Sequence, residues 1–219
     1  IAALQRAVKE GKDRFLFEMA TGTGKTLISA AVIKLFLRTG NARRVLFLVD
    51  RLELEDQAKK ALTKVLANDY QVVIYKENRD DWRRAEVVVT TVQSLLFNNK
   101  YQQLFSPTDF DLVISDEAHR SIGGNARAVF DYFIGYKLGL TATPKETKYV
   151  SSSTYFGEPV YTYSLKQGIE DGFLAPYKVV RIDIDKDIEG WTPPPGMKDD
   201  LGQEIEQREY NQKDMDRIL

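Results

Sequence analysis

Hydrophobic residues along the chain gather in short runs, separated by segments with helical spacing. Six of these runs, between the amino terminus and residue 144, are rich in Val, Ile, Leu and Phe. Continuous apolar runs bounded by helices are typical of parallel strands that are buried on both faces of a sheet. The predicted strands are residues 15–19, 45–49, 72–75, 86–91, 111–115 and 137–142. The pattern therefore predicts an α/β domain with a doubly wound parallel sheet.

Two of the segments between the strands show a clear helical pattern. TLISAAVIKLFLRTG, at residues 26–40, is apolar at helical spacing and has Gly40 as a C-terminal stop. LELEDQAKKALTKVLA, at residues 52–67, is the second predicted helix. Because ligands of doubly wound sheets bind at the carboxyl ends of the strands, we expect the functional residues there.

The pattern changes after Pro144. Residues 145–154 are polar and end in a serine-rich stretch that is the best candidate for a linker. In the following segment SLKQGIEDG, Ser164 and Gln167 have the spacing of a capping box, and Gly172 can end a short helix. We therefore place a domain boundary in this region. The predicted domains are residues 1–155 and, as the opening of a second domain, residues 156–219.

Beyond the short helix the chain is predicted to contain one more strand and a charged segment. YKVVRIDID, at residues 177–185, has the composition of a strand. WTPPPG, at residues 191–196, excludes regular structure because proline lacks an N–H group and fixes φ. EIEQREYNQKDMDRIL, at residues 204–219, is predicted to be partly helical with Asn211 as a cap. Since the chain starts at Ile1 within one helical pattern and stops within another, we expect it to be a piece of a longer protein.

The composition is that of a globular protein and narrows the possible functions. Charged residues make up 29% of the 219 residues, hydrophobic residues 43%, and the formal net charge is −1. A protein that coats nucleic acid would be basic, so any contact with nucleic acid is expected to be local. The absence of cysteine excludes a disulfide scaffold and favours a cytoplasmic protein. The longest apolar stretch is interrupted by Ser29 and Lys34 and is too short to cross a membrane.

MATGTGKT, at residues 19–26, follows the first predicted strand and has the composition of a phosphate-binding loop. Gly22 and Gly24 allow backbone N–H groups to turn toward a phosphate, and the next helix directs its positive dipole end to the same place. Lys25 can reach the β- and γ-phosphates, and the Thr26 hydroxyl can bind Mg²⁺. The alternative is a glycine-rich turn between a strand and a helix. The predicted ATP-binding residues of the loop are Thr21, Gly22, Thr23, Gly24, Lys25 and Thr26.

DLVISDEAH, at residues 111–119, is the second candidate motif. Its apolar strand brings Asp116 and Glu117 to the carboxyl edge of the sheet. Asp116 suits the binding of Mg²⁺, either directly or through water, and Glu117 can orient and deprotonate an attacking water molecule. The alternative is a strand that ends in a solvated acidic turn. His119, the only histidine in the chain, belongs to the same motif.

GLTATP, at residues 139–144, is the third motif. Its strand ends in small hydroxyl residues, and Thr141 and Thr143 are placed to hydrogen-bond to His119 or Glu117. We predict that Thr141, Thr143 and His119 couple the nucleotide site to the rest of the protein. Taken alone, the segment would be an ordinary strand end followed by a turn.

The order of these motifs resembles that of superfamily-two helicases and translocases, whose DEAH and TATP motifs the chain matches residue for residue. MATGTGKT as a whole is similar to one branch, the restriction (R) subunits of type I restriction–modification enzymes, and the family tolerates Met19 where the usual loop has glycine. FLVDRLELEDQA resembles motif Ia of that branch, in which a helix carrying Gln57 follows VDR. DEAHRS is similar to its acidic motif, and YFGEPVYTYSLKQGIEDGFLAPYKV and REYNQKD resemble its connection into the second motor lobe.

This resemblance implies a RecA-like fold of the P-loop NTPases, the start of a second RecA-like lobe, and ATP and Mg²⁺ as cofactors. It implies that Gln5, in LQRAV, contacts adenine. The alternative is that Gln5 is an ordinary glutamine on the protein surface. It also implies that four residues face the phosphates of nucleic acid: Arg51, Thr90, Thr91 and Gln93. The alternative for Arg51 is a solvated residue at the start of a helix. The alternative for Thr90 and Thr91 is that they are ordinary strand-forming threonines.

The favoured function is that of an ATP-dependent translocase that pulls double-stranded DNA toward a nuclease. Its catalytic residues would be Lys25, Asp116 and Glu117, and its Mg²⁺ ligands Thr26 and Asp116. The resemblance implies specificity and methylation subunits as partners. It also implies that the arginine finger and the nuclease domain lie outside these residues.

Three other functions stay open. A strand-separating DNA or RNA helicase of the DEAH type is the first, although RNA helicases more often have SAT in place of TATP. A nucleotide-controlled switch that binds nucleic acid without stepping is the second, and Glu117 counts against it because a switch needs no base. A Rossmann-like protein without motor activity is the third, and it would require three ordered motifs to be a coincidence.

Overall fold

The computed structural model describes residues 1–66, 69–76, 81–144, 151–178, 192–198 and 204. The chain divides into two compact units, Ile1–Ala175 and Pro176–Leu219. All three motifs lie in the first unit.

The second unit has few described residues. Residues 192–196 form neither helix nor strand, as their prolines predict, and an isolated antiparallel bridge joins Lys198 and Glu204. The strand predicted at residues 177–185 and the helical segment predicted at residues 204–219 lie, apart from a few residues, outside the described part of the chain.

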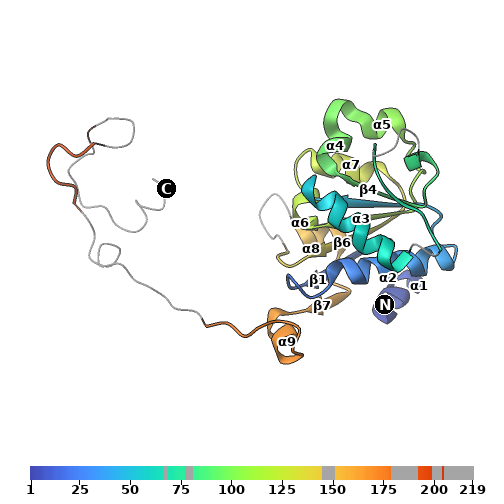
Figure 1. The fold of residues 1–219 in the computed structure, drawn as a ribbon, viewed down its shortest axis with the longest axis horizontal. Coiled ribbons are helices and arrows are strands. Elements are labelled where there is room, and N and C mark those ends of the chain that lie inside the picture. Colours follow the sequence, from blue (N-terminus) through green and yellow to red (C-terminus); the bar gives the residue numbers. More distant parts are fainter. Residues whose placement is uncertain (67–68, 77–80, 145–150, 179–191, 199–203, 205–219) are drawn as a thin grey trace. The chain divides into compact units, whose positions relative to one another are not determined.

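The described residues of the first unit form one seven-stranded sheet with the order β3-β4-β2-β5-β6-β1-β7 (Figure 1). All paired strands of this sheet are parallel. The strands are β1 (Arg14–Met19), β2 (Val45–Val49), β3 (Val72–Ile74), β4 (Val87–Thr91), β5 (Leu112–Asp116), β6 (Tyr136–Thr141) and β7 (Tyr161–Tyr163). The six predicted strands and the doubly wound parallel sheet are therefore confirmed, and β7 is additional.

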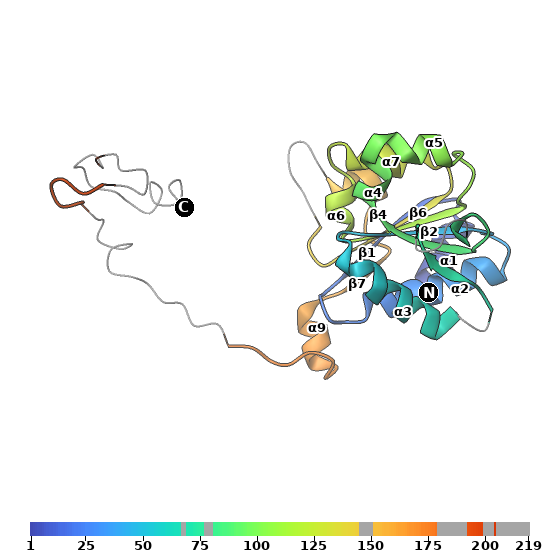
Figure 2. The same cartoon turned by 45° about the horizontal axis from the view of Figure 1, so that its top comes forward.

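Helices cover both faces of this sheet, as Figure 2 shows. On one face lie α1 (Ala2–Lys9), α2 (Lys25–Arg38) and α3 (Glu53–Leu66). On the other lie α4 (Val92–Leu96), α5 (Lys100–Leu104), α6 (Ala118–Ser121), α7 (Ala126–Tyr132) and α8 (Ser152–Phe156), with the 3-10 turns η1 (Asp81–Arg83) and η2 (Phe97–Asn99). In the part of the chain that the structure describes, no helix has both the length and the apolar character needed to cross a membrane.

Alternate strand residues fill the two hydrophobic cores. In β1, Phe15, Phe17 and Met19 pack toward α1, α2 and α3, whereas Leu16 packs toward the helices of the opposite face. All five residues of β2 are buried. Because a central strand is covered on both faces, consecutive positions must all be apolar, which explains the continuous runs in the sequence.

The first compact unit extends beyond the predicted boundary at residue 155. β7 pairs with β1, and the N–H of Ala20 donates to the carbonyl oxygen of Tyr163 at 3.0 Å. α9 (Leu165–Glu170) follows β7, and its predicted capping box between Ser164 and Gln167 is present. The prediction that a second motor lobe begins in the remaining residues stays a prediction.

The parallel sheet places all strand carboxyl ends on one edge. The segments after β1, β5 and β6 occupy one half of this edge, and those after β2, β3 and β4 occupy the other. Since β2 and β5 are neighbours, the two halves meet between them. Ligand sites of such sheets lie along this edge, so the fold brings two candidate sites next to each other.

Candidate active site

The glycine-rich loop begins where β1 ends. Met19 is the last residue of the strand, is 3% exposed and packs in the core of α1, α2 and α3. The turn itself is made by Gly22 (φ 82°) and Gly24 (φ 89°), whose left-handed backbone favours glycine. The hydroxyl of Thr23 closes the turn by donating to the carbonyl oxygen of Ala20 at 2.6 Å. Methionine therefore fits the first position because that position belongs to the buried strand and not to the turn.

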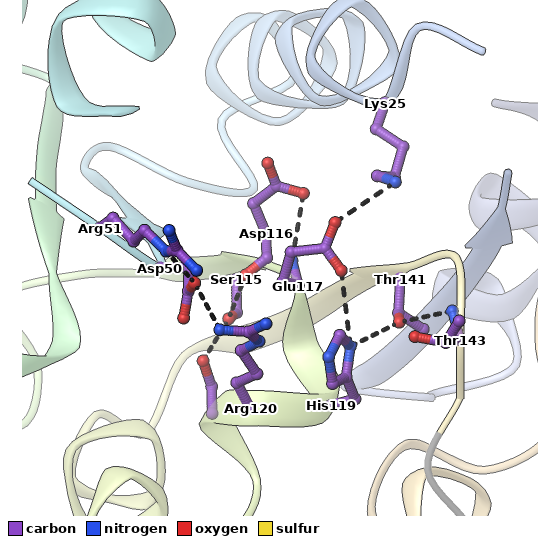
Figure 3. Close-up of polar contacts among 11 residues, drawn as sticks. Lys25, Asp50, Arg51, Ser115, Asp116, Glu117, His119, Arg120, Thr141 and Thr143 are labelled. Atoms are coloured by element: carbon purple, nitrogen blue, oxygen red, sulfur yellow. Dashed lines mark hydrogen bonds and ion pairs between the residues drawn. The ribbon is translucent and has the colours of Figure 1, made fainter. Parts of the chain in front are cut away.

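Lys25 is the first residue of α2 and points toward the strand end that carries the acidic motif (Figure 3). Its side chain is only 10% exposed, and its ammonium nitrogen makes no hydrogen bond to any described residue. The nearest charge is the Glu117 carboxylate, with Nζ 3.5 Å from Oε1. A buried ammonium without hydrogen bonds is costly, so its environment is suited to an added anion.

Asp116 and Glu117 stand at the end of β5. The N–H of Glu117 donates to Oδ1 of Asp116 at 3.1 Å. Burial raises the pKa of the Asp116 carboxyl, the neighbouring Glu117 raises it further, and Lys25 opposes both effects. A cation beside Asp116 would relieve this penalty on the carboxylate, so the donor set fits Mg²⁺. Glu117 has a left-handed backbone (φ 51°), which costs a non-glycine residue on the order of 1–2 kcal/mol and is typical of functional sites.

The third motif meets the second through His119. Nδ1 of His119 is 2.9 Å from Oγ1 of Thr141, and it is also 3.5 Å from Oε2 of Glu117. The N–H of Thr143 donates to the same Thr141 oxygen at 3.1 Å. The structure thus brings together the residues predicted to couple the site, with Thr143 contributing its backbone. Gly139 permits this approach, because a Cβ there would lie 2.9 Å from Cβ of Ala118.

An ion pair between β2 and β5 was not predicted from the sequence. Nη1 of Arg120 donates to Oδ2 of Asp50 at 2.8 Å, and Nε of Arg51 lies 3.5 Å from the same oxygen (Figure 3). Asp50 follows β2, whereas Arg120 follows the acidic motif on β5. This carboxylate therefore joins the half of the sheet edge that carries the glycine-rich loop to the other half.

The other half of the edge contains an open groove of about 610 Å³. Three predicted nucleic-acid residues line it: Arg51, Thr91 and Gln93. Thr90 does not, because it is fully buried in β4 and its hydroxyl lies beside Glu55 without a hydrogen bond of good geometry. The structure therefore gives Thr90 no surface on which to meet nucleic acid.

Thr91 and Glu55 fix the floor of the groove. The Thr91 hydroxyl accepts the N–H of Ser94 at 3.1 Å as the cap of α4, and the Thr91 N–H donates to Oε1 of Glu55 at 3.1 Å. Burial raises the pKa of Glu55, and the Thr91 N–H opposes that shift. Thr91 and Glu55 are thus positioning residues that hold β4 against α3.

Gln5 is not brought to the loop. It is exposed on α1 and lines a separate cavity of about 200 Å³ with Leu35, Phe36 and Thr39 of the α2 end. The loop lies at the opposite end of α2, about 15 Å from this cavity at 1.5 Å of rise per residue. The predicted contact of Gln5 with adenine stays a prediction.

The segment after β7 lies against the loop, which the sequence did not predict. A Cβ added at Gly22 would be 3.1 Å from Cδ2 of Leu174, and one added at Gly168 would be 3.3 Å from Cγ2 of Thr23. α9 and the residues after it thus lie against part of the glycine-rich loop.

Comparison with known proteins places this site in a family. Residues 1–146 match the family described as "Type III restriction enzyme, res subunit". The endonuclease subunit of the type I restriction enzyme EcoAI from Escherichia coli is 45% identical over 224 residues, which cover 97% of the chain. The chain spans 27% of the length of that subunit.

Solved structures show the same fold. A fragment described as an HsdR subunit of a type I restriction enzyme from Vibrio vulnificus YJ016 is 31% identical, with a TM-score of 0.61 over 80% of the chain and 31% of that structure. The Hef helicase domain of Pyrococcus furiosus is 26% identical, with a TM-score of 0.58 over 74% of the chain and 37% of that structure. The match over residues 1–146 shows that the chain belongs to the Res subunit family of restriction enzymes, and its similarity to the two type I subunits identifies it as an HsdR-like helicase domain of superfamily two with a RecA-like fold.

Proposed function

We propose that the chain forms the first motor lobe of an ATP-dependent translocase on double-stranded DNA, within the R subunit of a type I restriction enzyme. The observation that carries the proposal is the buried Lys25 ammonium, which makes no hydrogen bond to a described residue and lies 3.5 Å from Glu117. A glycine turn and the N terminus of α2 stand beside it, and both favour a phosphate.

The residues at the carboxyl edge fit the roles of a nucleotide hydrolase. Backbone N–H groups of residues 21–24 and the Lys25 ammonium bind phosphate, while Thr26 and Asp116 hold Mg²⁺. Bound ATP supplies the phosphoanhydride bond whose hydrolysis drives the motor. Glu117 orients the attacking water and takes its proton at a carboxylate oxygen. His119, held by Thr141, keeps that carboxylate in place.

Arg51 and Gln93 in the groove are the proposed contacts to DNA. Arg51 has a side chain that is 68% exposed, and a guanidinium is suited to phosphate. Thr91 contributes to DNA binding indirectly, because its hydroxyl caps the N terminus of α4 and so holds that helix in place. The specificity and methylation subunits are the proposed partners, by analogy with the type I restriction enzymes to which the chain is similar.

Glu117 also favours a motor over a switch that only binds nucleotide. Its carboxylate lies between the Lys25 ammonium and the His119 ring, each at 3.5 Å. A switch has no need of a base at this position, whereas hydrolysis needs one.

Triplex displacement distinguishes a translocase from a strand-separating helicase. We expect the full-length R subunit, with its partner subunits and ATP, to release a third strand from blunt duplex DNA without separating the duplex. The reason is that a translocase moves along the duplex while both of its strands stay paired. Unwinding of tailed DNA or RNA without third-strand release would instead show a DEAH-type helicase.

The Asp50–Arg120 pair is proposed to transmit DNA binding to the nucleotide site. We expect Arg120→Gln in the full-length protein to keep basal ATP hydrolysis and to lower its stimulation by DNA about tenfold, within the usual range of coupling energies. The physical reason is that Asp50 contacts both Arg120 and the DNA-facing Arg51. ATPase rates with and without duplex DNA measure the effect.

Arg127→Gln is the matched control for this variant. Arg127 has a comparable exposure, 55% against 54% for Arg120, and pairs with Asp131 at 3.0 Å on α7. In the double variant Asp50→Asn/Arg120→Gln, the stimulation by DNA is expected to be no lower than in Arg120→Gln alone. Both substitutions break the same contact between Asp50 and Arg120. An unchanged stimulation ratio in Arg120→Gln would remove the pair from the coupling.

A further inference from the structure

Part of the groove is formed by two lysines and a phenylalanine that have no role in the function proposed above. Lys76 follows β3, Phe97 starts η2 and Lys100 starts α5, and all three line the groove of about 610 Å³. Phe97 is 62% exposed, and Nζ of Lys100 lies 4.5 Å from the centre of its ring. An exposed aromatic ring beside an ammonium presents an apolar surface next to a positive charge.

The backbone around these side chains has three left-handed positions. Asn98 (φ 54°) and Asn99 (φ 52°) follow Phe97 in consecutive left-handed conformations, and Lys76 has φ 69°. Asparagine adopts this conformation more readily than other residues with a side chain, whereas for lysine it is unfavourable. Strained backbone gathers at functional sites, so the conformation of Lys76 agrees with a binding role for this surface.

In the part of the chain that the structure describes, the positive charges of this surface are not paired with carboxylates. Contact with Lys76 lowers the pKa of Lys100, so the two ammonium groups are close together. Among the described residues, no carboxylate forms an ion pair with either of them.

The acidic residues that line the same groove belong to its α3 side. Asp50 is held by Arg120, Glu55 accepts the N–H of Thr91, and Glu53 lies in the first turn of α3. The two neighbouring lysines therefore favour an anion with more than one charge.

We propose that Lys76, Phe97 and Lys100 form a sugar–phosphate clamp on DNA, separate from the contacts at Arg51 and Gln93. The lysines bind phosphates of one strand, and the Phe97 ring packs on the sugar between them. This inference rests on the proposed translocase function. A motor that moves over any sequence must hold features that every nucleotide shares, and a phosphate and a sugar are such features.

The salt dependence of DNA binding tests the roles of the lysine and the phenylalanine separately. The full-length protein is titrated against a short fluorescent duplex by anisotropy, at several salt concentrations. Lys100→Gln is expected to lower the slope of log affinity against log salt by about 1, because one phosphate contact is lost. Phe97→Ala is expected to weaken affinity about tenfold and to leave that slope unchanged, because the ring carries no charge.

Controls at the opposite edge of the sheet complete the test. Lys12→Gln and Ile134→Ala change an exposed lysine and an exposed apolar residue outside the groove, and neither is expected to alter affinity or slope. If Lys100→Gln and Phe97→Ala both match the wild type while DNA still stimulates ATP hydrolysis, the clamp is wrong and the translocase function stands. If the wild type shows no DNA-stimulated hydrolysis, the proposed function and the clamp both fail.

Discussion

Lys25→Ala in the full-length protein is expected to weaken ATP binding about 100-fold or more and to abolish DNA-stimulated hydrolysis. The ammonium is buried, has no hydrogen bond to any described residue and lies 3.5 Å from Glu117, so we expect bound phosphates to provide its strongest contacts. Removal of the charged partner from a buried pair costs roughly 2–5 kcal/mol. Isothermal titration calorimetry with ATP and Mg²⁺ measures the loss directly.

The same substitution is expected to change the melting temperature without ATP only slightly. Alanine removes a buried charge that has no hydrogen bond to any described residue, which favours folding, but it also removes the ion pair with Glu117, which opposes that gain. Lys34→Ala on the same helix is the control, because Lys34 pairs with Asp69 at 2.8 Å on the surface. That variant should bind ATP normally and lose no more than about 1 kcal/mol of stability. Unchanged ATP affinity in Lys25→Ala would reject the phosphate-binding loop.

The sequence predicted the elements whose signals are local. The strands β1 to β6 are buried on both faces, so each appears as a continuous apolar run that no solvated loop would carry. The loop of Gly22 and Gly24 was predictable because left-handed turns require glycine at fixed spacing. β7 was missed because its three residues are exposed or half-buried at the sheet edge and leave no apolar pattern.

Contacts between distant residues were predicted only where motifs indicated them, as for His119 and Thr141. Asp50 and Arg120 are 70 positions apart, and only the pairing of β2 with β5 brings them together. Thr90 belongs to a motif that resembles nucleic-acid contacts, but the alternation of side chains along β4 turns it into the sheet. Gln5 matched a family residue within a helical pattern, and that pattern does not indicate where the helix packs.

Glu117→Gln is expected to retain ATP binding and to lower turnover by about 10²–10⁴-fold, which is the usual contribution of a general base. Glutamine keeps the volume of the side chain but cannot accept a proton from water. Its neutral amide also removes a negative charge that stands 3.5 Å from the Lys25 ammonium and beside Asp116. Because Glu117 contributes to the raised pKa of Asp116, its neutralisation should favour the charged form of that carboxylate.

ATP affinity in the presence of Mg²⁺ should therefore be equal to or tighter than that of the wild type, while turnover is lost. Single-turnover hydrolysis and calorimetry on the same preparation separate these two effects. Glu170→Gln is the control, since Glu170 is 60% exposed on α9, pairs with Lys166 and is expected to change neither quantity. A parallel loss of binding and turnover would mean that Glu117 positions Lys25, and surviving turnover would assign the base to another group. Only tight binding without turnover agrees with a carboxylate that takes a proton during hydrolysis.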